Sequence, residues 1–116
     1  VLYMDKLINF FKILSDDTRL RIMILLYHRE LCVCQICGVT NISQPNVSKH
    51  LAKLRDMGFV KDERKGQFIY YYLSLEEPIY KEIIKSIVDN IEDYAILKSD
   101  IEKLNDIEKY LESCGK

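Results

Sequence analysis

The sequence lacks the features that mark several large classes of protein. It contains no tryptophan, only two prolines and only four glycines, and no apolar run approaches the ~20 residues of a transmembrane helix. It also has no signal-peptide pattern, no Pro/Gly-rich linker, no internal repeat and no low-complexity tract. At a length of 116 residues, these absences predict one cytoplasmic domain without membrane contact.

Ligands for a common zinc site are also scarce. Only two histidines occur, and no complete four-cysteine site of two pairs is present. Three of the four cysteines nevertheless stand within six positions of the segment ELCVCQIC, residues 30–37. In a chain expected to be cytosolic, where thiols stay reduced, a structural disulfide among Cys32, Cys34 and Cys37 is disfavoured. The cluster therefore indicates metal binding or redox chemistry.

Net charge is close to zero, but the charge is unevenly distributed along the chain. The formal net charge is −1. Residues 44–74 carry six Lys/Arg against three Asp/Glu, whereas residues 75–116 carry six against eleven. A basic middle segment and an acidic tail are compatible with a localised surface that faces nucleic-acid phosphates.

Hydrophobic periodicity predicts two helices before the cysteine cluster. In residues 3–14, apolar side chains recur at steps of three and four, which is typical of an amphipathic helix: Leu7, Phe10, Phe11 and Leu14. Ser15 or Asp16 can cap a second helix. The apolar residues of that helix leave little polar surface, so we expect it at the centre of the core: Leu20, Ile22, Ile24, Leu25 and Leu26.

The segment NISQPNVSKHLAKL predicts a helix with a polar outer face. Ser43 is a good N-cap, Pro45 fits the first turn, and Gly58 can end the helix. Its buried stripe consists of three apolar residues at helical spacing: Val47, Leu51 and Leu54. The outer face carries groups that read base edges and bind phosphates: Gln44, Asn46, Ser48, Lys49 and Lys53. Taken alone, this face is also compatible with a solvated surface helix.

Two strand-like runs, Phe59–Glu63 and Phe68–Leu73, follow this helix. Gly66 supplies the turn between them, so the pair predicts a β-hairpin. Its tip carries three side chains suited to DNA contacts: Arg64, Lys65 and Gln67. A mostly α chain with such a hairpin wing has the layout of a winged helix-turn-helix. In that fold the recognition helix enters the major groove and the wing contacts the neighbouring backbone or minor groove.

With these motifs the chain resembles the ArsR/SmtB family of metal-responsive repressors over roughly residues 4–97. ELCVCQIC is similar to the ELCVCDLC motif of the arsenic-sensing ArsR branch, with Gln35 in place of the usual Asp, and SQPNVSKHLAKL resembles the recognition helix of the family. The resemblance implies a homodimeric repressor, not an enzyme, that leaves its double-stranded operator DNA when metal binds. The metal ligands that it implies are Cys32, Cys34 and Cys37.

The spacing of these cysteines is awkward for a regular helix. Cys34 and Cys37 share one helix face, whereas Cys32 lies about 200° around the axis from Cys34. We expect three sulfurs to reach one small ion only if the first turn is distorted. Because that turn leads into the recognition helix, ligand binding would be coupled to the geometry of DNA binding.

Three thiolates without a neighbouring histidine suit a soft, three-coordinate ion such as As(III) or Sb(III). Cd(II) and Zn(II), which prefer four ligands, are the alternative ions. Cys114 would add a ligand only if the tail folded back. Oxidation or persulfidation of the same thiols, without a metal, is a further alternative. A thiol oxidoreductase built on Cys34 and Cys37 is disfavoured, because no βαβ alternation surrounds the pair.

The C-terminal part predicts a dimer interface. A long apolar stripe runs through a helix expected at about 77–97: Ile79, Ile83, Ile84, Ile87, Ile91 and Tyr94. We expect this stripe and the first helix to pair across a two-fold axis. Ser99 with Glu102 indicates the start of a further helix. The predicted organisation is a domain over 1–98, with the helix-turn-helix at about 32–57 and the wing at about 59–73, and a helical extension over 99–116.

Overall fold

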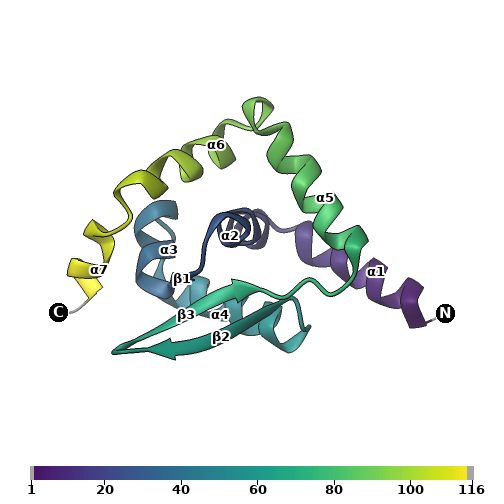
Figure 1. Cartoon of the computed structure of the whole chain (residues 1–116), viewed down its shortest axis with the longest axis horizontal. Helices are drawn as coiled ribbons and strands as arrows, with labels where there is room; N and C mark the ends of the chain where they lie inside the picture. The colour runs from purple at the N-terminus through teal and green to yellow at the C-terminus, as the bar shows by residue number, and fades with distance from the viewer. Residues whose placement is uncertain (1, 115–116) are drawn as a thin grey trace.

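The structure is a computed structural model that describes the backbone of residues 2–114 and the side chains of residues 4–111. Within that range, helices pack beside a small antiparallel sheet that lies along the lower edge of the view (Figure 1). The α-helices are α1 (Leu2–Leu14), α2 (Asp17–His28), α3 (Val33–Thr40), α4 (Gln44–Asp56), α5 (Pro78–Asp89), α6 (Ala95–Glu102) and α7 (Lys109–Cys114). Two 3₁₀ turns, η1 (Ile91–Asp93) and η2 (Lys103–Asp106), flank α6, and the strands are β1 (Leu31–Cys32), β2 (Val60–Lys65) and β3 (Phe68–Leu73). The predicted fold class, mostly α with a β-hairpin wing, is confirmed.

Helix α2 lies at the centre of the molecule, as its apolar sequence predicts (Figure 1). Its residues 22–26 are all buried. Asp16 is the N-cap, and its Oδ2 accepts a hydrogen bond from the Arg19 backbone N–H at 3.0 Å. This hydrogen bond is the main reason why the pKa of Asp16 is lowered from its ordinary value of 3.8. The cap therefore stabilises the fold above that value, and its contribution is lost as the pH falls through the lower pKa of the folded state.

The sheet has the order β1–β3–β2, and its strand β1 was not predicted from the sequence. A two-residue strand is too short to show the alternation that identifies longer strands. It pairs Leu31 with Tyr71 and Cys32 with Tyr70, so the first cysteine is tied to the wing. The predicted hairpin is confirmed, with Gly66 at φ 65° in the turn between β2 and β3.

The C-terminal helices differ from the prediction. The helix expected at about 77–97 ends at Asp89, the chain turns through η1, and α6 begins at Ala95. Ser99 consequently lies inside α6 and does not cap a helix. Helices α5 and α6 form an arch above α2 (Figure 1), where α6 packs on α2 and α7 packs on α3. The extension is therefore part of the domain's own packing.

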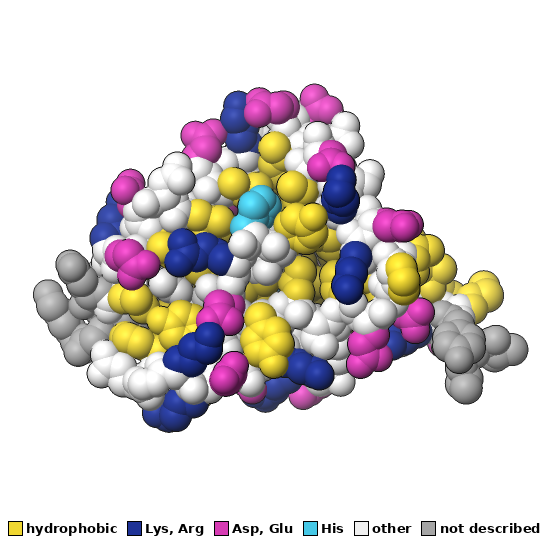
Figure 2. Space-filling model, in the orientation of Figure 1, with side chains coloured by type: hydrophobic (Ala, Val, Ile, Leu, Met, Phe, Trp, Pro, Cys, Tyr) yellow, Lys and Arg dark blue, Asp and Glu magenta, His cyan; other side chains and the backbone are white. Residues whose placement is uncertain are grey.

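The apolar stripe of this region mainly serves the core of its own domain. Ile84 is fully buried, and Ile83, Ile87 and Ile91 pack half-buried against the same core. The large apolar side chains that are exposed on α1 and at the start of α5 are Met4, Ile8, Phe11 and Ile79, and Tyr94 and Ile96 are exposed nearer α6. Hydrophobic side chains accordingly appear at the right-hand end of the molecule, where α1 and α5 converge (Figure 2). None of the described helices has the length and apolar character to cross a membrane.

Candidate sensor site and DNA-binding surface

Cys32 is buried at the junction between β1 and α3. It is the N-cap of α3, with φ −90° and ψ 168°, and its side chain is 2% exposed. Its backbone N–H donates to Oε1 of Gln35 at 3.0 Å. Because Cys32 is in extended backbone, it is not placed around a helix axis as the spacing argument assumed. Gln35, which replaces the usual Asp of the family motif, is a capping residue. Its position three residues after the N-cap is the sequence signal for this role.

Cys34 and Cys37 line one pocket of about 500 Å³ on α3. The other walls of this thiol pocket come from Val33, Gly38, Tyr110 and residues 41–44, which lead into α4. Cys32 and Cys37 are free thiols, whereas Cys34 is disulfide-bonded in the structure. Among the described side chains, no group of three His, Cys, Asp or Glu residues is arranged to hold a metal ion. The three predicted ligands are thus close in the chain but not assembled.

The thiol of Cys37 is disfavoured as an anion. Burial raises its pKa, and the neighbouring Cys32 raises it further, while a backbone hydrogen bond opposes the shift. Cys37 is therefore a protonated thiol at neutral pH. A divalent cation that requires thiolates must release that proton on binding.

Tyr110 covers the part of α3 next to the thiol pocket. A Cβ atom built on Gly38 would lie 2.0 Å from Cδ1 and 2.4 Å from Cγ of the tyrosine ring, so only glycine leaves room for it. This contact was not predicted from the sequence. Its signal is a glycine inside a helix, which costs stability unless a close approach requires it. Cys114, at the end of α7, has a side chain outside the described residues.

Helices α3 and α4 form the predicted helix-turn-helix. Val47, Leu51 and Leu54 are fully buried, so the predicted inner stripe of α4 is confirmed. The five side chains predicted to contact DNA are all exposed on this helix: Gln44, Asn46, Ser48, Lys49 and Lys53. The helix begins at Gln44 with Ser43 as its N-cap and Pro45 in the first turn.

The tip of the wing presents the predicted polar side chains to solvent. Arg64, Lys65 and Gln67 are exposed, and Lys65 is paired with Glu30. Lys and Arg side chains lie along the lower edge of the molecule, near the β2–β3 hairpin, together with acidic side chains (Figure 2). Since Glu30 neutralises Lys65 locally, Arg64 is the stronger positive charge of the tip.

His50 is a packed residue on the inner side of α4. Its Nδ1 lies 3.4 Å from Nη1 of Arg19, and its Nε2 lies 3.8 Å from Oδ2 of Asp16. Burial lowers its pKa, although Asp16 opposes the shift. The histidine therefore joins α4 to the start of α2 through these two contacts.

The helix-turn-helix of α3 and α4, followed by the β2–β3 wing, defines the winged helix-turn-helix class of regulatory proteins. The sequence profile of the family described as "Bacterial regulatory protein, arsR family" matches residues 16–62. The crystal structure of the transcriptional regulator HlyU from Vibrio vulnificus CMCP6 has a TM-score of 0.68 and 32% identity, covering 76% of this chain and 90% of that one. The chain belongs to the arsR family of bacterial regulatory proteins.

Some relatives with similar sequences have arsenic-related names. The arsenic resistance transcriptional regulator ArsR1 of Pseudomonas putida (strain KT2440) is 46% identical over 81 residues, 68% of this chain and 63% of the relative. The arsenical resistance operon repressor of Escherichia coli (strain K12) is 46% identical over 74 residues, 63% of each chain. The cadmium resistance regulatory protein CadC of Listeria innocua is 43% identical over 66 residues, 56% of each chain. The chain thus spans less than two thirds of the length of these relatives.

A second similar solved structure is that of a homodimer. The solution structure of the homodimeric winged helix-turn-helix DNA-binding domain of Mb0332 from Mycobacterium bovis has a TM-score of 0.65 and 25% identity. The match covers 82% of this chain and 85% of that domain.

Proposed function

We propose that this protein is a DNA-binding repressor that leaves its operator when Cys32, Cys34 and Cys37 bind As(III) or Sb(III). One observation carries the proposal. The pocket that contains Cys34 and Cys37 is also lined by Asn41, Ile42, Ser43 and Gln44, the turn and first residue of the recognition helix. A ligand that rearranges the thiols therefore acts next to the DNA-binding element.

Operator binding follows from the exposed face of α4. Gln44, Asn46 and Ser48 supply the donors and acceptors that read base edges in the major groove, and Lys49 and Lys53 bind phosphates. Arg64, Lys65 and Gln67 of the wing contact the adjacent backbone or minor groove. The wing set is the weaker one, since Lys65 is already paired with Glu30.

Arsenite binding is a condensation that needs no free thiolate. Each As–OH bond of arsenous acid is replaced by an As–S bond, and the thiol proton leaves with the hydroxide as water. Three thiols thus release three waters, and the raised pKa of Cys37 does not oppose the reaction. A cellular thiol must first reduce the disulfide at Cys34. Cys32 must also leave its buried position, which disturbs its hydrogen bond to Gln35 and its pairing with Tyr70.

Thiol-based redox sensing is the second candidate, and the disulfide at Cys34 favours it. Oxidised and reduced forms of the same α3 segment would then differ in operator affinity. Cd(II) and Zn(II) are disfavoured as inducers, because they prefer four ligands and require thiolates.

The test is release from DNA. A fluorescent duplex selected from a random pool by the reduced protein is titrated with arsenite, antimonite, cadmium, zinc or peroxide, with a phosphine as the reductant in the metal titrations. We expect arsenite and antimonite to lower the anisotropy to that of free DNA. Release by peroxide alone, or by cadmium alone, would replace the proposed inducer by the corresponding alternative.

The second part of the proposal is a homodimer. The proposed interface is the apolar surface formed by α1 and the start of α5. On this surface Met4 is 65% exposed and Phe11 is 50% exposed. We expect Phe11→Glu combined with Ile79→Glu to give monomers in sedimentation at micromolar concentration. The paired control is Tyr94→Glu, an exposed aromatic away from this surface, which should stay dimeric. A monomeric wild-type protein, or a dimeric double variant, contradicts the assignment.

A further inference from the structure

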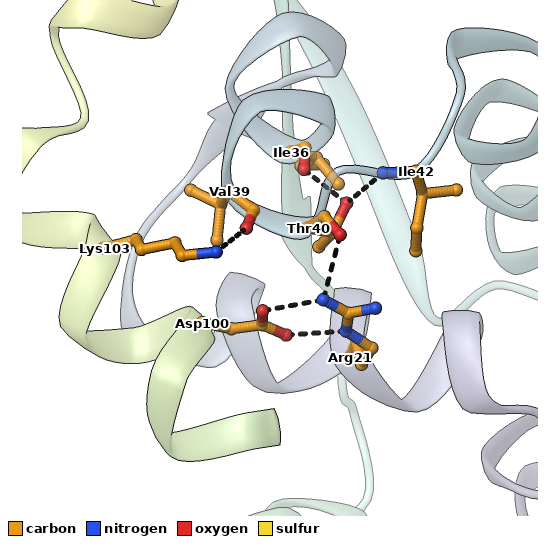
Figure 3. Close-up of polar contacts among 7 residues, drawn as sticks. All are labelled: Arg21, Ile36, Val39, Thr40, Ile42, Asp100 and Lys103. Carbon is orange, nitrogen blue, oxygen red and sulfur yellow. Dashed lines mark hydrogen bonds and ion pairs between the residues drawn. The ribbon is translucent and has the colours of Figure 1, made fainter. Parts of the chain in front are cut away.

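Residues 95–111, here called the C-terminal segment, reach both the thiol pocket and the turn of the helix-turn-helix. The segment comprises α6, η2 and the first residues of α7. Figure 3 shows α6 beside α2 and the last turn of α3, with side chains from all three converging. The profile match of the family ends at residue 62, so the C-terminal segment lies outside it.

A buried ion pair joins the C-terminal segment to α2 and α3. The carboxylate of Asp100 is 2% exposed and accepts hydrogen bonds from Nε and Nη2 of Arg21, both at 2.8 Å. The same Nη2 donates to the backbone carbonyl of Thr40 at 3.1 Å. One guanidinium on α2 is thus held by α6 and holds the last residue of α3 (Figure 3).

Lys103 makes a second contact with the same end of α3. Its Nζ donates to the carbonyl of Val39 at 3.2 Å. The last carbonyls of a helix have no partner within it, and cations are favourable at this end. Thr40 continues the connection, because its hydroxyl donates to the Ile36 carbonyl at 2.7 Å and accepts from the Ile42 N–H at 3.3 Å. The turn into the recognition helix is therefore capped by the C-terminal segment.

The other end of the segment rests on the sensor side of α3. Tyr110 packs on Gly38 so closely that no Cβ fits between them, and its ring is a wall of the thiol pocket. A ligand that draws the sulfurs of this helix together changes the surface on which Tyr110 lies.

We propose that the C-terminal segment is a brace that positions the helix-turn-helix for DNA. Asp100 and Lys103 are its positioning residues, which hold the turn between α3 and α4. Tyr110 is the contact through which a ligand at the cysteines loosens the brace. This last step rests on the proposed function, whereas the positioning of the turn does not. A brace that differs between the DNA-bound and ligand-bound forms supplies the differential interaction that any inducer requires.

The first arm of the test measures operator affinity without inducer, for the reduced full chain well below its melting temperature. Asp100→Asn and Lys103→Met should each weaken operator binding at least fivefold, which is the lower range of couplings between sites. Lys103→Arg, which keeps a cationic donor, should restore the affinity. Glu102→Gln is the matched control, since Glu102 is an exposed carboxylate on the same helix. Variants that match this control in affinity overturn the positioning role.

The second arm measures the arsenite concentration at half-release. Tyr110→Ala should lower it about fivefold, and Tyr110→Phe, which keeps the ring, should leave it unchanged. Gly38→Ala should reproduce the effect of Tyr110→Ala, because the added methyl group displaces the ring while favouring the helix. The double variant Gly38→Ala/Tyr110→Ala should add little to Tyr110→Ala, since both changes remove the same contact.

Unchanged release in Tyr110→Ala and Gly38→Ala, with a responsive wild type, overturns the part assigned to Tyr110. A wild-type protein that arsenite does not release contradicts the proposed inducer instead. In that case the operator affinities of the Asp100 and Lys103 variants by themselves support or overturn the brace.

Discussion

Cys32→Ser and Cys34→Ser should bind the operator like the wild-type protein but should no longer be released by arsenite. Serine keeps the approximate size of the residue, and the exposed face of α4 is untouched. Moving operator occupancy from 99% to 1% requires about 10⁴-fold tighter inducer binding to the released form, or about 5.5 kcal/mol. A variant that lacks one of the three As–S bonds, or the rearrangement at Cys32, loses much of this difference in inducer affinity between the released and DNA-bound forms. The measurement is anisotropy of labelled operator titrated with arsenite under a phosphine reductant.

Substitution of the remaining cysteines should have smaller effects on release by arsenite. Cys37→Ser should be released at a moderately higher arsenite concentration, since Cys32 and Cys34 demand the larger change in the segment before α4. Cys114→Ser should have the smallest effect. Thermal melting of each variant checks that the buried position of Cys32 tolerates a hydroxyl. If the Cys32 and Cys34 variants respond as the wild type does, the cluster is not the sensor.

Lys49→Ala and Lys53→Ala should weaken operator binding and reduce its dependence on salt. The plot of log K against log salt concentration has a negative slope. Each lost phosphate contact makes this slope less steep by about 0.9 in each half-site. Gln44→Ala, Asn46→Ala and Ser48→Ala should instead change sequence preference, by about 1–3 kcal/mol for each lost pair of base contacts. Both sets are measured by anisotropy at several salt concentrations, on the selected duplex and on single-base variants of it.

A matched control for the lysines is Lys81→Ala, because Lys81 is an exposed lysine on α5, outside the helix-turn-helix. It should leave the salt slope unchanged. Equal affinity, slope and preference in all five α4 variants would show that this helix does not read the operator.

Local signals were sufficient for the elements around the DNA-binding helix. Ser43 and Pro45 start α4 where predicted, and its apolar residues at helical spacing are buried because α4 packs one face on the domain. The hairpin follows from Gly66 and its flanking β-branched and aromatic runs. The same period that buries Leu51 exposes Lys49 and Lys53, so a helix pattern alone placed the candidate DNA-binding face.

The C-terminal part could not be read in the same way. An apolar stripe is the same signal whether it faces a partner or its own core, and here Ile84 and its neighbours pack on their own domain. The break of the predicted helix at Asn90 lets α6 turn back over α2, and no proline or glycine marks it. Long-range packing against α2 and α3 thus decided the course of this segment.

The helix-turn-helix and the wing could be predicted from the sequence alone, because each depends on residues close together in the chain. The folded structure was needed to show that Cys32 is a buried N-cap joined to the wing and that Cys34 and Cys37 line one pocket. It also brought Asp100 to Arg21 across 79 positions. Contacts over such separations depend on how whole helices pack, and local periodicity carries no information about that packing.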